Sequence, residues 1–293
     1  MENIMKKYIQ KAIEAFYKLI DGKEEGEPDT RYRSWEWCYD AFKKGKKKYD
    51  GAGKEEKAEI VDYLSLHLGF YLASWGMYRG SSYLLKRDYK AHKKVVEMIL
   101  EADKSLWGFN PKSESIDNAR EKLFGEDGLY MKIKNGYNNY ENSNEDDASD
   151  TLVTKILLGT LGCVPAFDRF LKKGIKWLKD KYSSAEKEKL TATIENNKNP
   201  GSTFVALSKF AIKFKEELKL KNVETVEYPV MKCVDMFFWQ VGYELDLLKG
   251  LEDNKNSNDK KKKLVFAASK CEICEEYDTV EEVIETIKSR WDL

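Results

Sequence analysis

Apolar residues recur at helical spacing along nearly the whole chain, and this period constrains the fold more than any other feature. The first stripe consists of Ile4, Tyr8, Ala12, Phe16 and Ile20. Helix breakers are scarce: the 293 residues include only 5 prolines and 18 glycines, whereas these two types together make up about 12% of an average chain. We therefore predict an all-α protein, a multi-helix globular bundle without strands.

The most apolar segment runs from residue 59 to residue 85, and we predict that it forms a long central helix near 60–85. Capping-box sequences mark two other helix starts, at Ser183-x-x-Glu186 and Thr279-x-x-Glu282. Together with these two, the predicted helices outside the central segment cover 4–20, 35–48, 88–102, 151–160, 166–181, 184–196, 203–219, 229–249, 262–275 and 279–291.

A polar stretch at 125–150 divides the chain. It is rich in Asn, Asp, Gly and Tyr, and its Asn135-Gly136 pair is a turn signal. We interpret it as a polar linker or loop between an N-terminal helical half, 1–124, and a C-terminal helical half, 151–293, which together form one compact unit. A lysine- and asparagine-rich insert at 252–263 is predicted to be a solvated loop.

The charges balance, with 51 Lys and Arg residues against 51 Asp and Glu residues. This balance excludes attachment to nucleic acid or to an acidic membrane by total charge alone, so contacts to phosphate must come from locally placed cations. No run of 18 apolar residues is present, and the first residues lack the apolar core of a secretory signal. We expect no membrane partner.

Cysteine usage is typical of a reducing compartment, because there are five cysteines, an odd number. Cys271-x-x-Cys274 has the spacing of half a zinc site, but no second pair exists and neither histidine is near it in sequence. We therefore predict a cytoplasmic protein with no metal and no cofactor. The oligomeric state is left open.

One stripe of the predicted central helix has the composition of a ligand site. It contains His67, Trp75 and Arg79, followed by Ser81 and Ser82. The indole ring can stack on a base, and a guanidinium beside hydroxyls suits phosphate or carboxylate. In the alternative interpretation these side chains fill the core, and Arg79 pairs with an acid.

Further along, Arg87-Asp-Tyr-Lys-Ala-His92 resembles the R-x4-H motif of HEPN ribonucleases, which are helical proteins. The resemblance implies that Arg87 and His92 act on the scissile RNA phosphate. Histidine can serve as acid or base near neutral pH, and arginine can stabilise charge that develops on a phosphate.

Another motif opens the C-terminal half. Thr154-Lys155 is followed by a glycine-containing stretch and then by Pro165-Ala-Phe-Asp168. Proline suits the first turn of a new helix, and a carboxylate is favoured near a helix N-terminus. This order resembles the helix-hairpin-helix DNA glycosylase superfamily, particularly its bacterial members.

The late helix of those proteins ends in an aromatic-x-x-Gly pattern, which residues 228–242 resemble through Trp239 and Gly242. The resemblance covers about 150–250, one third of the chain. It implies a bacterial protein with DNA or RNA as its partner.

The same resemblance implies that Asp168 is the acid that supports the cationic sugar transition state and that Lys155 lies near the position of the nucleophilic lysine. From the residues alone, Asp168 is equally a helix cap or an ion-pair partner of Arg169 or Lys172. The catalytic candidates are thus Asp168 and Lys155. Three functions remain open: a glycosylase-like nucleic-acid-interacting protein, a HEPN-like ribonuclease, and a non-enzymatic helical scaffold or binding module.

Overall fold

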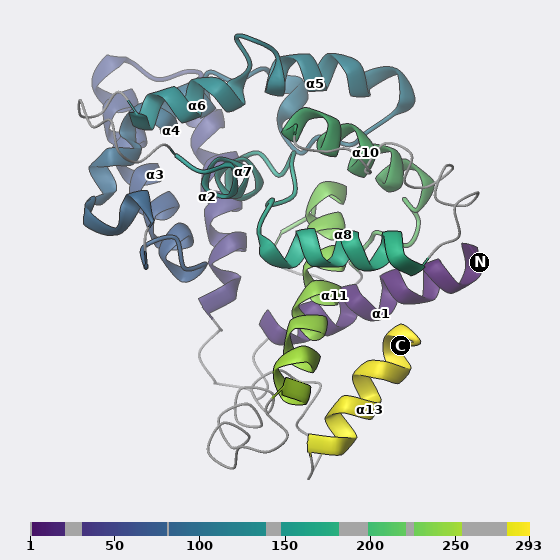
Figure 1. Ribbon diagram of the computed structural model, residues 1–293. Coiled ribbons are helices and arrows are strands. Elements are labelled where there is room, and N and C mark those ends of the chain that lie inside the picture. Colours follow the sequence, from purple (N-terminus) through teal and green to yellow (C-terminus); the bar gives the residue numbers. More distant parts are fainter. Residues whose placement is uncertain are drawn as a thin grey trace.

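The computed structural model shows an all-α protein (Figure 1). It describes residues 2–20, 31–80, 82–138, 148–181, 199–220, 226–253 and 280–293, and none of these residues is in a strand. The helices are α1 (Glu2–Ile20), α2 (Ser34–Tyr49), α3 (Lys54–Ser74), α4 (Lys93–Leu100), α5 (Ile116–Phe124), α6 (Leu129–Asn138), α7 (Asp150–Thr160), α8 (Arg169–Lys181), α10 (Pro200–Lys213), α11 (Val230–Asp253) and α13 (Val280–Trp291). Short 3-10 turns are η1 (Arg31–Arg33), η2 (Tyr83–Lys86), η3 (Tyr89–His92), η4 (Lys104–Leu106) and η5 (Ser113–Ser115).

Helix α11 is the central element of the C-terminal half, and α8, α1, α10 and α13 pack around it (Figure 1). Its contact with α8 is unusually close: a Cβ atom on Gly242 would lie 1.9 Å from the Phe170 carbonyl oxygen, and one on Gly174 would lie 2.2 Å from that of Phe238. Only glycine at both positions allows the two backbones to approach in this way.

Helix α7 connects the two halves because it packs on α2 and α3 while its own residues 152–160 are all buried. The Trp35 indole donates a hydrogen bond to the Leu158 carbonyl oxygen (3.0 Å), and the Tyr71 hydroxyl donates one to the Lys155 carbonyl oxygen (3.1 Å). One hydrophobic cluster therefore contains residues from both halves.

The predicted central helix near 60–85 is too long. Helix α3 starts earlier, at Lys54, and ends at Ser74. Gly76 and Gly80 follow with φ angles of 76° and 62°, a left-handed conformation that ends a right-handed helix. Ser82 consequently belongs to the turn after the helix, where it caps η2.

The polar stretch at 125–150 also differs from the prediction, because α6 covers Leu129–Asn138. The Asn135-Gly136 pair lies inside this helix and does not form a turn. The reason is tertiary packing: Ile133 and Tyr137 of α6 are fully buried, and α6 packs on α4.

Several predictions fall on residues outside those that the structure describes: the helices at 184–196 and 262–275, most of the insert at 252–263, Ser81, and the pair Cys271 and Cys274. In the described part of the chain, no helix combines the length and the apolar character needed to cross a membrane.

Candidate functional site

Two buried ion pairs lie side by side between α7, α8 and α11. Lys155 Nζ is 3.3 Å from Asp168 Oδ2, and Lys232 Nζ is 3.1 Å from Asp235 Oδ2. Their side chains are 6% and 13% exposed in the first pair, and 2% and 3% exposed in the second. The two residues of the Thr-Lys and Pro-x-x-Asp segments therefore meet.

Asp168 is positioned by the start of α8. Its Oδ1 atom accepts hydrogen bonds from the backbone N–H groups of Phe170 (3.0 Å) and Leu171 (3.1 Å), so the carboxylate caps the helix. Its other oxygen faces Lys155. The neighbouring Arg169 pairs with Asp246 instead, at 3.3 Å. Asp168 is thus both a helix cap and the partner of a lysine on another helix.

The loop from 161 to 168 is held against α11 and α7 by side chains. Asp235 Oδ1 accepts a hydrogen bond from the Ala166 N–H group (2.9 Å), and Thr154 Oγ1 accepts one from the Phe167 N–H group (2.9 Å). Asp235 consequently serves two roles, since its other oxygen contacts Lys232. This anchoring fixes the loop directly before Asp168.

Trp75 lies against the lysines of both pairs. Its ring is 5.0 Å from Lys155 Nζ and 5.3 Å from Lys232 Nζ, within the range of a cation–π contact, and 6.0 Å from the ring of Trp239 in an edge-on arrangement. The indole nitrogen of Trp75 is buried and has no hydrogen-bond partner among the described residues. A donor in this condition favours a ligand that brings an acceptor.

Burial works against both charges of the inner pair. Desolvation raises the pKa of Asp235, an effect that Lys232 opposes and Asp168 reinforces. Desolvation lowers the pKa of Lys232, an effect that Asp235 opposes and Lys155 reinforces. The two pairs therefore form one electrostatically coupled group, which is typical of functional sites.

The space among these side chains is too small to admit a water molecule. Its lining consists of Tyr71, Trp75, Lys155, Leu158, Ala166, Asp168, Lys232, Asp235 and Trp239. The site is closed in this conformation, so a ligand can enter only if a lining side chain moves.

Of the predicted ligand-binding residues that the structure describes, only Trp75 lines this space. His67 is half-buried on α3 against the ring of Tyr63, with ring centroids 4.5 Å apart, and burial lowers its pKa. Arg79 is exposed and folds back over Gly76, whose added Cβ would lie 2.7 Å from Arg79 Nε. The prediction of one helical stripe fails because α3 ends before Arg79.

The ribonuclease arrangement does not occur. His92 is fully buried, with Nε2 2.7 Å from the Tyr78 hydroxyl and Nδ1 2.7 Å from the Tyr137 hydroxyl. Burial lowers its pKa to about 4, so the ring is neutral at pH 7. Arg87 instead lies over the ring of Tyr83, at 5.1 Å. A phosphate cannot reach a histidine enclosed by two tyrosines.

Lys232 and Asp235 were not predicted as site residues from the sequence. A signal existed, because the two charges stand three positions apart in an otherwise apolar helix, MKCVDMFFW. Charges at that spacing share a helix face, and in a buried helix they must be paired.

The described residues include no group of three or more His, Cys, Asp or Glu side chains that is placed to hold a metal ion. Comparisons with protein-family models, with curated proteins and with solved structures found no match for this chain.

Proposed function

We propose that this protein binds nucleic acid and accommodates one unstacked base beside Trp75, where Lys155 and Asp168 act on the attached sugar. The observation that carries the proposal is the 3.3 Å contact between Lys155 Nζ and Asp168 Oδ2. These are the two residues that the resemblance to DNA glycosylases assigns to catalysis, and they come from different elements.

The energetics of burial support a functional role. An ion pair in a protein interior is often no more stabilising than apolar residues of the same size, because desolvation offsets the attraction. Here two such pairs lie within one small space and are lined by aromatic rings. Aromatic rings are the surfaces on which unpaired bases stack, at about 1–3 kcal/mol per base.

In the proposed reaction, Asp168 and Lys155 have different roles. The bond between the base and C1′ of the sugar breaks, and its electron pair leaves with the base. The carboxylate of Asp168 stabilises the positive charge that develops on the sugar. The ammonium of Lys155 donates a proton to the departing base, and the resulting amine forms a bond to C1′, as a nucleophilic lysine does. Transfer of a proton from this nitrogen to the ring oxygen then breaks the bond between C1′ and that oxygen and leaves a protonated imine, which borohydride can reduce.

Binding is the first test. Fluorescence anisotropy with labelled single- and double-stranded DNA and RNA, each over a salt series, should show affinity that falls as salt rises. A 2-aminopurine base in the bound strand should be quenched by the wild type and less so by Trp75→Leu. An absence of salt-dependent binding to all four nucleic acids contradicts the proposal.

Catalysis is tested separately by borohydride trapping on DNA that contains an abasic site. The wild type should form a covalent adduct through Lys155, and Lys155→Met should abolish it. Asp168→Asn, which can still cap α8, should slow the trapping, and Lys249→Met, at an exposed lysine of α11, should not. Binding without trapping in the wild type would contradict the catalytic part and leave a nucleic-acid-binding module.

A further inference from the structure

A second and larger cavity, of about 780 Å³, lies at the junction of α2, α10 and α11. Its lining residues come from α2, from the loop that contains Trp107 to Asn110, from the segment after α10, and from residues 226–230 at the start of α11. None of them lines the space around Lys155 and Asp168. Small-molecule sites in proteins typically have volumes of about 300–1,000 Å³.

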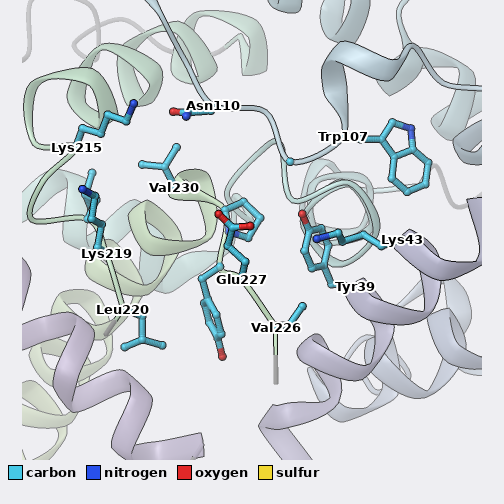
Figure 2. A pocket seen from close by; sticks show the side chains of 14 residues that line it. Tyr39, Lys43, Trp107, Asn110, Lys215, Lys219, Leu220, Val226, Glu227 and Val230 are labelled. Atoms are coloured by element: carbon cyan, nitrogen blue, oxygen red, sulfur yellow. The ribbon is translucent and has the colours of Figure 1, made fainter. Parts of the chain in front are cut away.

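The charged side chains of this cavity are unevenly distributed. Among the described residues, Lys43, Lys215 and Lys219 line it together with one acidic side chain, Glu227. In Figure 2, Lys215 and Lys219 occupy one wall, Lys43 extends from the opposite wall, and Glu227 lies between them. The paired lysines favour an anionic group at one wall, and Glu227 favours a hydrogen-bond donor beside that group.

The lining also offers a rigid aromatic surface. The Tyr39 ring stacks on the buried ring of Trp35, with centroids 5.1 Å apart and an interplanar angle of 14°. Tyr228 packs on the same Trp35 ring, at 4.9 Å. Tyr39 is only 3% exposed, whereas Tyr228 is partly exposed and is the ring that the cavity presents to a ligand. Because Trp35 holds Tyr228 from behind, its position is set before a ligand arrives, which lowers the entropy lost on binding.

The ion pair of Lys219 with Glu216, at 2.6 Å, does not prevent ligand binding. Both side chains are largely exposed, 52% and 76%, and pairs of this kind contribute little to stability. Lys219 can therefore exchange Glu216 for a phosphate at small cost. Lys215, one turn earlier in the chain, is exposed on the same wall.

We propose that this cavity binds a nucleotide. Lys215 and Lys219 bind its phosphates, the carboxylate of Glu227 accepts hydrogen bonds from sugar hydroxyls, and the base lies against Tyr228. The size of the cavity favours a small molecule over a polynucleotide strand, which needs a groove continuous at both ends. This assignment does not rest on the proposed function of the Lys155 site, because the two sites share no residue.

The test is isothermal titration calorimetry with ADP, GDP, CDP and UDP, with inorganic pyrophosphate and adenosine as partial ligands. At least one diphosphate should bind more tightly than pyrophosphate and than adenosine. The double variant Lys215→Met and Lys219→Met should weaken that affinity by about a hundredfold, since each lost charged hydrogen bond weakens binding roughly tenfold. Adenosine affinity should not change in this variant.

A matched control separates the cavity from general charge effects. Lys209→Met, at an exposed lysine of α10 outside the cavity, should keep wild-type nucleotide affinity. Circular dichroism checks that each variant is folded. Three outcomes overturn the proposal: no diphosphate binds, the double variant binds as the wild type does, or a single-stranded oligonucleotide displaces the nucleotide and depends on the same lysines.

Discussion

A single added carbon atom is enough to prevent the packing of α8 on α11. A Cβ atom on Gly242 would lie 1.9 Å from the Phe170 carbonyl oxygen, which is backbone and cannot rotate away. We expect Gly242→Ala to lower the free energy of unfolding by about 3 kcal/mol, the upper end of the usual cost of overpacking. Urea denaturation measures this change.

Gly53→Ala is the matched control, because nothing lies within 4 Å of an added Cβ at that position. We expect it to change the free energy of unfolding by about 0.5 kcal/mol or less. Equal effects of the two substitutions would show that the close contact is not what makes Gly242 necessary.

The buried His92 makes stability depend on pH. Its pKa is lowered from 6.5 to about 4 by burial, so the unfolded chain takes up a proton below pH 6.5 that the folded protein does not. The contribution of the neutral His92 to the free energy of unfolding is therefore fully present above pH 6.5 and is lost as pH falls toward 4. The expected loss from this group between pH 7 and pH 5 is about 2 kcal/mol.

Because carboxylates also titrate in this range, the measurement is a comparison with His92→Gln. Urea denaturation of both proteins at pH 7 and pH 5 should show a smaller loss for the variant. Parallel losses in the two proteins would mean that His92 does not exchange protons differently in the folded and unfolded states.

At the scale of elements, one fully buried carboxylate of α11 binds two side chains of α13. Glu244 is fully buried and accepts hydrogen bonds from Trp291 Nε1 (2.7 Å), from Arg290 (3.0 Å) and from Gln240 (2.7 Å). Burial raises its pKa, which these donors oppose. Removing the carboxylate leaves the donors of α13 without their acceptor.

We expect Glu244→Ala to lower the free energy of unfolding by about 3–5 kcal/mol, the usual cost of breaking a buried charged network. Hydrogen exchange should show faster exchange for the amides of α13 than for those of α2. Glu281→Ala, at an exposed position of the same helix, should leave exchange unchanged. Equal protection of α13 in both variants would show that Glu244 does not hold it.

The elements also show where a sequence pattern is sufficient. Helices α1, α2, α7 and α11 follow from apolar spacing, which needs only one buried face to favour a helix. The end of α3 was predicted too late because Gly76 and Gly80 have the spacing of small residues on one helix face, and the sequence does not distinguish this role from that of glycines that end a helix. The turn predicted at Asn135-Gly136 failed because burial of Ile133 and Tyr137 outweighs a local turn preference.

At the scale of the whole molecule, the Lys155–Asp168 pair joins two helices at the centre of one core. Asp168→Asn keeps a capping side chain but leaves the buried ammonium of Lys155 without its carboxylate. We expect it to lower the free energy of unfolding by about 3–5 kcal/mol. Adding Lys155→Met should recover most of this loss, because the unpaired charge is then absent.

Urea denaturation of the two single variants and the double variant measures this coupling. The recovered double variant should still fail to form the trapped adduct, which would separate the function of the pair from its contribution to stability. A loss below about 1 kcal/mol for Asp168→Asn would mean that water reaches the lysine.

The site was predictable only in part. Trp75 was named from residue type and helical spacing, and Lys155 and Asp168 were named from the resemblance to DNA glycosylases. His67, Arg79 and Ser82 were named with Trp75 but lie elsewhere. Lys232 and Asp235 were missed because the sequence of an apolar helix does not show which residues will contact a charge within it. Which cations meet which carboxylates depends on contacts between α7, α8 and α11, far apart along the chain.

The amino-acid sequence by itself determined that this protein is helical and where most of its helices lie, because helical periodicity is a local property that each segment carries alone. It also determined that any phosphate contact must come from particular cations, because the total charge is zero. Only the tertiary structure decided which cations are buried and which are exposed. It enclosed Lys155 with Asp168, sealed His92 between two tyrosines, and left Lys215 and Lys219 at an open cavity, since burial is set by neighbours that no local pattern specifies.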